Sequence, residues 1–154
     1  MVKSQKHVLN RRDVVRELTK DREELLVVSG LGSSTYDLHA AGDNNQNFYL
    51  WGAMGGTAMI GFGLALAQPK KRVLVITGDG EQLMGLGSIA TIGIENPTNL
   101  IIVVLDNGHF AETGMQLSHT SLGVDLEKVA LAVGVKKTYL IETNAEFTKF
   151  LKEK

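Results

Sequence analysis

The chain has 154 residues, a formal net charge of −1 and no cysteine. The absence of cysteine excludes disulfide scaffolds, thiolate metal sites and cysteine nucleophiles. The near-neutral charge gives no indication of nucleic acid or of an anionic membrane surface as a partner. Hydrophobic residues make up 44% and charged residues 21%, values typical of a globular protein, so we expect a single domain over residues 1–154.

The N-terminal segment lacks the apolar stretch of a signal peptide, and the apolar run around residues 58–67 is short and interrupted by glycines. We therefore expect a cytoplasmic protein without membrane association. Glycine is unusually frequent, with 17 residues in the chain, ten of which lie between positions 52 and 93. This concentration indicates that the chain there approaches a ligand closely or packs tightly against itself.

Helix and strand signals alternate along the chain. The expected elements are a helix capped by Asn10, a strand at 25–30, a short helix at 33–41, a strand at 48–51, a helix at 54–67, a strand at 72–77, a helix at 82–94, a strand at 100–106, a loop at 108–123, a helix capped by Asp125, a strand at 137–142 and a helix beginning at Asn144. The strands are continuously apolar, which is typical of parallel strands covered on both faces. The pattern predicts a three-layer α/β/α fold with a mostly parallel central sheet.

Polar residues follow two of these apolar strands at the point where each strand ends. Asp79 follows LVITG, and Asp106 and Asn107 follow LIIVVL. Ligands bind beyond the carboxyl ends of strands in open parallel sheets, so Asp79 and Asn107 converge if the two strands are neighbours. Carboxylate, amide and carbonyl oxygens suit Mg²⁺, and a helix beginning after Gly80 favours a bound phosphate. The residues indicate a magnesium-diphosphate site. The alternative is that Asp79 only caps a helix and Asn107 only fills a turn.

The spacing of these residues resembles the motif of thiamine-diphosphate enzymes. GDG at 78–80 is followed by twenty-five residues and then by Asp106-Asn107. NFYLWGAMGGTAMIGFGLALA resembles the segment that contacts the cofactor's aminopyrimidine. GSIATIGIENPTNLI, LDNG and TGMQLSHT are most similar to the small, diphosphate-binding subunit of sulfopyruvate and phosphonopyruvate decarboxylases. The motif of thiamine-diphosphate enzymes usually has asparagine at the position of Asp106. The aspartate of this chain adds negative charge beside the expected ion.

The resemblance implies a site for thiamine diphosphate and Mg²⁺. Asp79 and Asn107 would bind the ion through their side chains, and His109 through its backbone oxygen. The residues expected to contact the cofactor along its diphosphate and at the ion are Gly32, Ser33, Ser34, Gly78, Asp79, Gly80, Glu81 and Asn107.

The resemblance also assigns residues to the reacting end of the cofactor. Met54 would be the wedge that folds the cofactor's two rings into a V, and the carbonyl of Gly52 would accept a hydrogen bond from the 4′-amino group. A 2-oxo acid would then lose CO₂ non-oxidatively, with the thiazolium ring taking up the electrons. Glu112 and His119, on the 108–123 loop, are candidates for proton transfer. The alternatives are ordinary helix packing for Met54 and a solvated loop for Glu112 and His119.

In enzymes of this kind, a glutamate on a separate pyrimidine-binding domain activates the cofactor, and 154 residues leave room only for the diphosphate-binding domain. The resemblance therefore implies a hetero-oligomer with a second chain of similar size, and a small 2-oxo acid as the substrate. Two alternatives stay open. One is a subunit of a thiamine-diphosphate carboligase or 2-oxo-acid oxidoreductase. The other is a non-catalytic nucleotide-binding Rossmann-like domain, because GLGSST at 30–35 follows a predicted strand.

Overall fold

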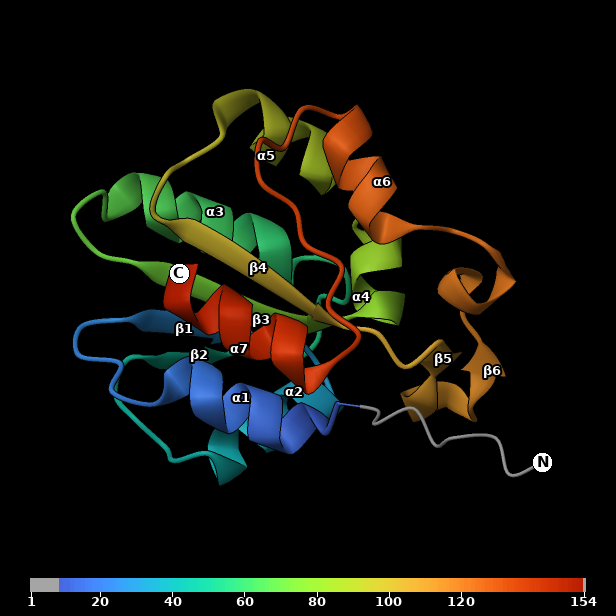
Figure 1. The fold of residues 1–154 in the computed structure, drawn as a ribbon, viewed down its shortest axis with the longest axis horizontal. Coiled ribbons are helices and arrows are strands. Elements are labelled where there is room, and N and C mark those ends of the chain that lie inside the picture. Colours follow the sequence, from blue (N-terminus) through green and yellow to red (C-terminus); the bar gives the residue numbers. More distant parts are fainter. Residues whose placement is uncertain (1–8, 154) are drawn as a thin grey trace.

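The computed structural model describes residues 9–153 (Figure 1). The expectation about the N-terminal segment therefore falls largely on residues 1–8, outside the described part. Within residues 9–153, no helix combines the length and the apolar character needed to cross a bilayer.

A four-stranded parallel sheet in the order β2-β1-β3-β4 forms the centre of the molecule. Its strands are β1 (Leu26–Ser29), β2 (Asn47–Tyr49), β3 (Val73–Gly78) and β4 (Leu100–Leu105). β3 lies between β1 and β4, and all of its residues except the last are buried. A strand buried on both faces cannot alternate apolar and polar side chains, which explains the continuous apolar run in the sequence.

Helices cover both faces of this sheet (Figure 1). They are α1 (Arg11–Thr19), α2 (Ser33–Ala40), α3 (Thr57–Ala67), α4 (Asp79–Met84), α5 (Ser88–Glu95), α6 (Leu126–Ala132) and α7 (Asn144–Glu153). One core cluster joins α1, α2 and α7 to the sheet, and a smaller cluster joins α3 and α5 to its other face. The predicted three-layer α/β/α fold is confirmed.

The predicted helix at 54–67 begins only at Thr57, so Met54 lies before it, and three further predicted elements differ from the structure. The predicted strand at 137–142 is wrong, because this segment pairs with no strand; its side chains are tied to α6 and α7, with Thr138 donating to Glu127 (2.9 Å) and Tyr139 to Glu153 (3.3 Å). The predicted helix at 82–94 is divided into α4 and α5. The 108–123 loop contains a small hairpin of β5 (His109–Phe110) and β6 (Gln116–Leu117), with the 3₁₀ turns η1 (Ala111–Thr113) and η2 (His119–Leu122).

The division between α4 and α5 has a packing cause. A Cβ atom placed on Gly85 would lie 2.1 Å from the carbonyl oxygen of Gly55, so two backbone segments touch at this point. Such an approach requires glycine, and glycine is also a weak helix former. The contact ties the segment before α3 to the helix that follows β3, and so helps to shape the site described below.

A buried carboxylate on α2 joins this helix to α1. The side chain of Asp37 is fully buried, with Nε of Arg11 at 3.0 Å and Nε of Arg12 at 3.4 Å. We expect Asp37→Ala to lower the free energy of unfolding by about 2 kcal/mol, because a charged hydrogen-bonding partner is lost while both arginines stay open to water. Asp13→Ala, which removes an exposed ion pair with Arg16, should cost less than about 1 kcal/mol. Equal urea midpoints for the two variants would contradict this account.

Candidate active site

The candidate site lies at the carboxyl edge of β3 and β4. Gly78 of β3 is paired with Leu105 of β4, so Asp79 and Asp106 are the next residues of the two strands at the same edge. The strands are neighbours, as the convergence predicted from the sequence requires. Hydroxyl groups and glycines of the neighbouring loops surround the Asp79 and Asp106 side chains at this edge.

The carboxylate of Asp79 is held by hydroxyl groups from the 108–123 loop. Asp79 is only 2% exposed; its Oδ2 accepts a hydrogen bond from the Ser118 hydroxyl, and the Thr120 hydroxyl lies 3.4 Å from the same oxygen. The Thr120 hydroxyl also lies 2.8 Å from Oδ1 of Asp106. The two carboxylates therefore share one hydroxyl neighbour. Ser118 and Thr120 are not among the site residues predicted from the sequence; the signal that could have indicated them is the hydroxyl-rich stretch SHTS at 118–121.

Asn107 and His109 form a local turn beside this cluster. The side-chain oxygen of Asn107 accepts a hydrogen bond from the backbone N–H of His109 (2.9 Å), and Nδ1 of His109 lies 2.8 Å from the Asn107 carbonyl. No hydrogen bond among residues 9–153 links Asn107 to Asp79. The structure thus connects Asp79 to Asp106, through Thr120, more closely than to the predicted ligand Asn107.

Glu81 points into the protein. It is 4% exposed; Oε1 accepts a hydrogen bond from the Thr57 hydroxyl, and Oε2 accepts from the Thr77 hydroxyl (2.9 Å) and the Leu31 N–H (3.2 Å). This carboxylate therefore joins α3, β3 and the β1–α2 loop. Only the main chain of Glu81 is left to contact a diphosphate. Gly30 leaves room for this carboxylate, because a Cβ atom at this position would come within 1.7 Å of Glu81 Oε2.

The hairpin loop brings Glu112 to the start of α2. Gly32 has φ +64°, and a Cβ atom on it would lie 2.4 Å from Oε1 of Glu112. The Glu112 carboxylate thus lies beside the position that precedes Ser33 and Ser34, which are predicted diphosphate contacts. This arrangement gives Glu112 a place at the site, although its side chain is exposed.

His119 reaches the same edge through Phe110. The two rings meet edge to face with their centroids 6.1 Å apart. Phe110 covers Gly80, because a Cβ atom on Gly80 would lie 2.5 Å from Cδ1 of that ring. The structure therefore brings His119 and the GDG turn together around one aromatic side chain.

Gly52 and Met54 lie in an unusual turn before α3. Gly52 (φ +90°), Ala53 (φ +47°) and Gly55 (φ +92°) all have left-handed backbone conformations. Met54 precedes α3 and is 39% exposed, so ordinary helix packing does not explain its position. A Cβ atom on Gly52 would meet no atom within 4 Å. This turn therefore leaves an open face at the site.

The donor set fits a magnesium ion held together with a phosphorylated ligand. Within residues 9–153, the side chains that hydrogen-bond to Asp79 do so through hydroxyl oxygens, and oxygens are the ligands that Mg²⁺ prefers. Among residues 9–153, no three His, Asp or Glu side chains are grouped to hold a metal by themselves. Mg²⁺ usually binds through one or two carboxylates and completes its shell with phosphate oxygens and water. The residues present therefore suit a diphosphate-bound ion better than an ion held by protein alone.

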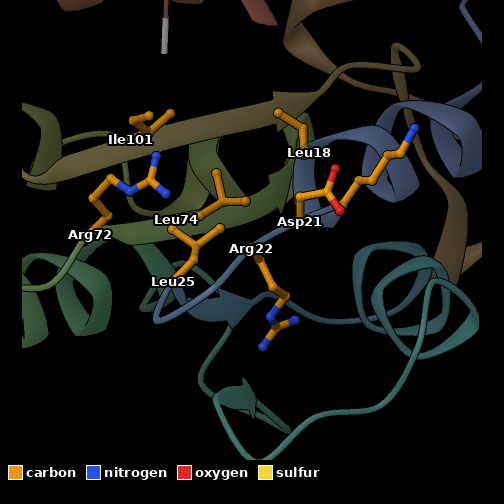
Figure 2. Close-up of a pocket in the computed structure, with 8 residues that line it drawn as sticks. Leu18, Asp21, Arg22, Leu25, Arg72, Leu74 and Ile101 are labelled. Atoms are coloured by element: carbon orange, nitrogen blue, oxygen red, sulfur yellow. The ribbon is translucent and has the colours of Figure 1, made fainter.

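A separate hollow lies at the opposite, amino-terminal edge of the sheet. Figure 2 shows its lining residues, and the guanidinium of Arg22 points away from Leu74 and Ile101. Burial lowers the pKa of Arg22. The hollow is lined by Leu18, Lys20, Asp21, Arg22, Leu25, Arg72, Leu74 and Ile101. None of the predicted site residues is among them, so this hollow is distinct from the candidate active site.

An open parallel sheet with oxygen donors and glycine turns at its carboxyl edge defines the class of α/β domains that bind phosphorylated ligands. Residues 30–154 match the family described as thiamine pyrophosphate enzyme, C-terminal TPP binding domain. The chain belongs to this family.

Two curated relatives and one solved structure show the range of similarity. The chain is 39% identical over 143 residues to sulfopyruvate decarboxylase subunit beta of Methanocaldococcus jannaschii, covering 92% of this chain and 75% of that protein. It is 44% identical over 126 residues to phosphonopyruvate decarboxylase of Streptomyces viridochromogenes, covering 82% of this chain and 30% of that protein. Benzoylformate decarboxylase from Polynucleobacter necessarius has the same fold, with a TM-score of 0.74 at 20% identity, covering 99% of this chain and 32% of that chain.

Proposed function

We propose that this chain is the Mg²⁺- and thiamine-diphosphate-binding subunit of a split 2-oxo-acid decarboxylase of the sulfopyruvate or phosphonopyruvate type. The observation that carries the proposal is the buried Asp79 carboxylate, held by hydroxyls at the edge where two parallel strands end. The identity to the Methanocaldococcus subunit over nearly the whole chain supports the reaction class.

The roles of the ligand residues follow from their positions. Asp79 would bind the ion through its carboxylate, Asn107 through its amide oxygen and His109 through its backbone oxygen. The diphosphate would lie along the start of α4 and the β1–α2 loop, where helix N-termini favour negative charge. The residues proposed for these contacts are Gly32, Ser33, Ser34, Gly78, Gly80 and the main chain of Glu81.

Thiamine diphosphate, when bound, supplies the electron sink for decarboxylation. The exposed Met54 and the carbonyl of Gly52 would position its ring end, from the left-handed turn before α3. Glu112 and His119 lie at the same edge of the sheet and are the groups of this chain that we assign to proton transfer.

A second chain is part of this proposal. The Methanocaldococcus relative is named as a subunit, and 70% of the Streptomyces relative has no counterpart in the match. The proposed partner is a pyrimidine-binding subunit of similar size that supplies the activating glutamate. The 108–123 loop contains no lysine or arginine, so the cation for a sulfonate or phosphonate tail has to come from elsewhere, and we assign it to the partner.

The outer face of α3 is the proposed docking surface for this partner. The helix carries no charged residue, and Met59, Ile60 and Leu66 are exposed on it. Trp51, at 73% exposure, precedes the same helix. Such an apolar face is unusual for a free surface and typical of an interface.

We expect Ile60→Asp to abolish co-purification of the partner chain while the circular dichroism spectrum stays unchanged, because a charge would be buried without a counter-ion. Leu140→Asp is the matched control, since Leu140 is also exposed but lies with residues of α7 around a separate hollow. Retention of the partner by the Ile60 variant at wild-type stoichiometry would rule out this docking surface.

The substrate proposal is tested by CO₂ release from the assembled enzyme. Sulfopyruvate, phosphonopyruvate and pyruvate should be compared with and without an added electron acceptor. We expect release from one of the two acids with an anionic tail, independent of the acceptor. Release that depends on the acceptor would instead support an oxidoreductase subunit, and release coupled to condensation with a second carbonyl compound would support a carboligase.

A further inference from the structure

Ser118 is a buried hydroxyl donor beside the proposed ion site. Its side chain is fully enclosed, its hydroxyl donates to Oδ2 of Asp79, and its backbone N–H donates to the Gly108 carbonyl at 2.8 Å. Thr120, two residues later, lies 2.9 Å from the Ser118 hydroxyl. The first contact joins residues 39 positions apart in the sequence, so it fixes the loop to the start of α4.

Both hydroxyls approach the same oxygen of Asp79. Oδ2 has the hydroxyls of Ser118 and Thr120 as neighbours, and Oδ1 accepts no hydrogen bond from a side chain within residues 9–153. The terminal torsion of an aspartate is soft, with a broad two-fold profile. A carboxylate whose one oxygen is fixed by hydroxyls therefore presents its other oxygen in a defined direction.

Asp106 fixes the second hydroxyl in turn. Its Oδ1 lies 2.8 Å from the Thr120 hydroxyl and accepts the N–H of Gly108 at 2.9 Å. Asp106 is thus connected to Thr120 of the 108–123 loop. Ser118, Thr120 and Asp106 form one connected set around the oxygen of Asp79 that would not meet the ion.

We propose that Ser118 and Thr120 are positioning residues that orient Asp79 toward the divalent cation. The inference rests on the proposed function, because it requires Asp79 to be an ion ligand. Groups that orient a ligand from outside the coordination shell commonly change metal affinity by 10–100-fold. The alternative role, called a latch below, is that the Ser118 and Thr120 hydroxyls block Asp79 and have to move away before the ion can bind. The position of both hydroxyls on Oδ2 favours orientation, since Oδ1 stays available while they are in place.

The test is a titration of the assembled enzyme with Mn²⁺, in the presence of thiamine diphosphate, with free Mn²⁺ measured by electron paramagnetic resonance. We expect Ser118→Ala to raise the Kd for Mn²⁺ by about 10–100-fold. Ser118→Thr, which keeps the hydroxyl, should restore the Kd to within about threefold of the wild-type value. Thr120→Val, a change of nearly constant shape, should raise the Kd in the same direction and supplies the test if the alanine variant does not fold.

Ser121→Ala is the matched control. The Ser121 hydroxyl donates to the Gly108 carbonyl (2.8 Å) from the same 3₁₀ turn and does not contact Asp79. Its removal should leave the Kd for Mn²⁺ unchanged. An unchanged Kd in folded Ser118→Ala or Thr120→Val would overturn the inference, and tighter binding would establish the latch instead. Failure of the wild-type complex to bind Mn²⁺ would instead count against the proposed function itself.

Discussion

Asp79→Asn is expected to abolish retention of thiamine diphosphate and to weaken Mg²⁺ binding by more than about 100-fold. The expected loss exceeds the 10–100-fold typical of groups outside the coordination shell, because a charged ligand of the ion is removed. The amide keeps the shape of the side chain and still offers an oxygen to the Ser118 hydroxyl. The free energy of unfolding should therefore fall by no more than about 1–2 kcal/mol. Isothermal titration calorimetry of the assembled variant with thiamine diphosphate and Mg²⁺ measures the loss of cofactor and metal binding.

Asp106→Asn is the control for this prediction. It makes the same chemical change at the equivalent register of the neighbouring strand, on a residue that we do not assign as an ion ligand. Its effect on Mg²⁺ affinity should stay below about tenfold. If the two variants lost affinity equally, the ion would be held by charge at the edge in general rather than by Asp79. Full cofactor retention by Asp79→Asn would remove Asp79 from the metal site.

Glu81→Ala is expected to lower the free energy of unfolding by about 3 kcal/mol and to weaken cofactor binding as well. The variant leaves three donors without their acceptor: the hydroxyls of Thr57 and Thr77, and the Leu31 N–H. Each unpaired buried donor costs about 1–3 kcal/mol, and neighbouring losses are not additive. Cofactor binding should weaken because Glu81 holds the β1–α2 loop at the start of α4. Urea unfolding and cofactor titration measure the two effects.

Glu95→Ala controls for the general effect of removing a glutamate. Glu95 is exposed at the end of α5, and its removal should change stability by less than about 0.5 kcal/mol. A Glu81→Ala protein as stable as the control would show that its buried hydrogen bonds contribute little. Unchanged cofactor affinity in a destabilised Glu81→Ala protein would show that Glu81 stabilises the fold but does not contribute to cofactor binding.

The sheet and its ligand edge were predictable because their signals are local. Continuous apolar runs mark strands buried on both faces, and Asn10 and Asp125 cap α1 and α6 as predicted. Gly78 of the GDG motif is the last residue of β3 and Asp79 is the first of α4, so the position of Asp79 at the carboxyl edge depends only on where the strand ends. The family resemblance followed from the same short segments, and the match over residues 30–154 confirms it.

The contacts around the site depend on residues far apart in the sequence. Ser118 meets Asp79 across 39 positions, and Leu31 meets Glu81 across 50. Glu81 is an acidic residue at the start of a helix, a position that ordinarily faces solvent or an anion site, yet its carboxylate turns inward to three donors. The break between α4 and α5 likewise arises from Gly85 meeting Gly55, a packing event that helix periodicity does not report.

The segment KTYLIE at 137–142 does not form the strand that its residue types predict. Its composition suits a strand, but a strand also needs an edge with free backbone groups in the right place. Here Ile141 packs against the core while Leu140 is exposed, and the side chains of Thr138 and Tyr139 hold the segment to helices. Tertiary contacts therefore decide the structure of this segment.

We propose above that this chain holds Mg²⁺ and thiamine diphosphate at the edge formed by β3 and β4. The most direct measurement is calorimetric titration of thiamine diphosphate into the chain assembled with its co-purifying partner, first with Mg²⁺ and then with the metal removed by chelation. We expect saturable binding that requires Mg²⁺ and disappears in Asp79→Asn. Absence of binding by the assembled wild-type protein with Mg²⁺ present, or binding that Asp79→Asn retains in full, would contradict the proposal.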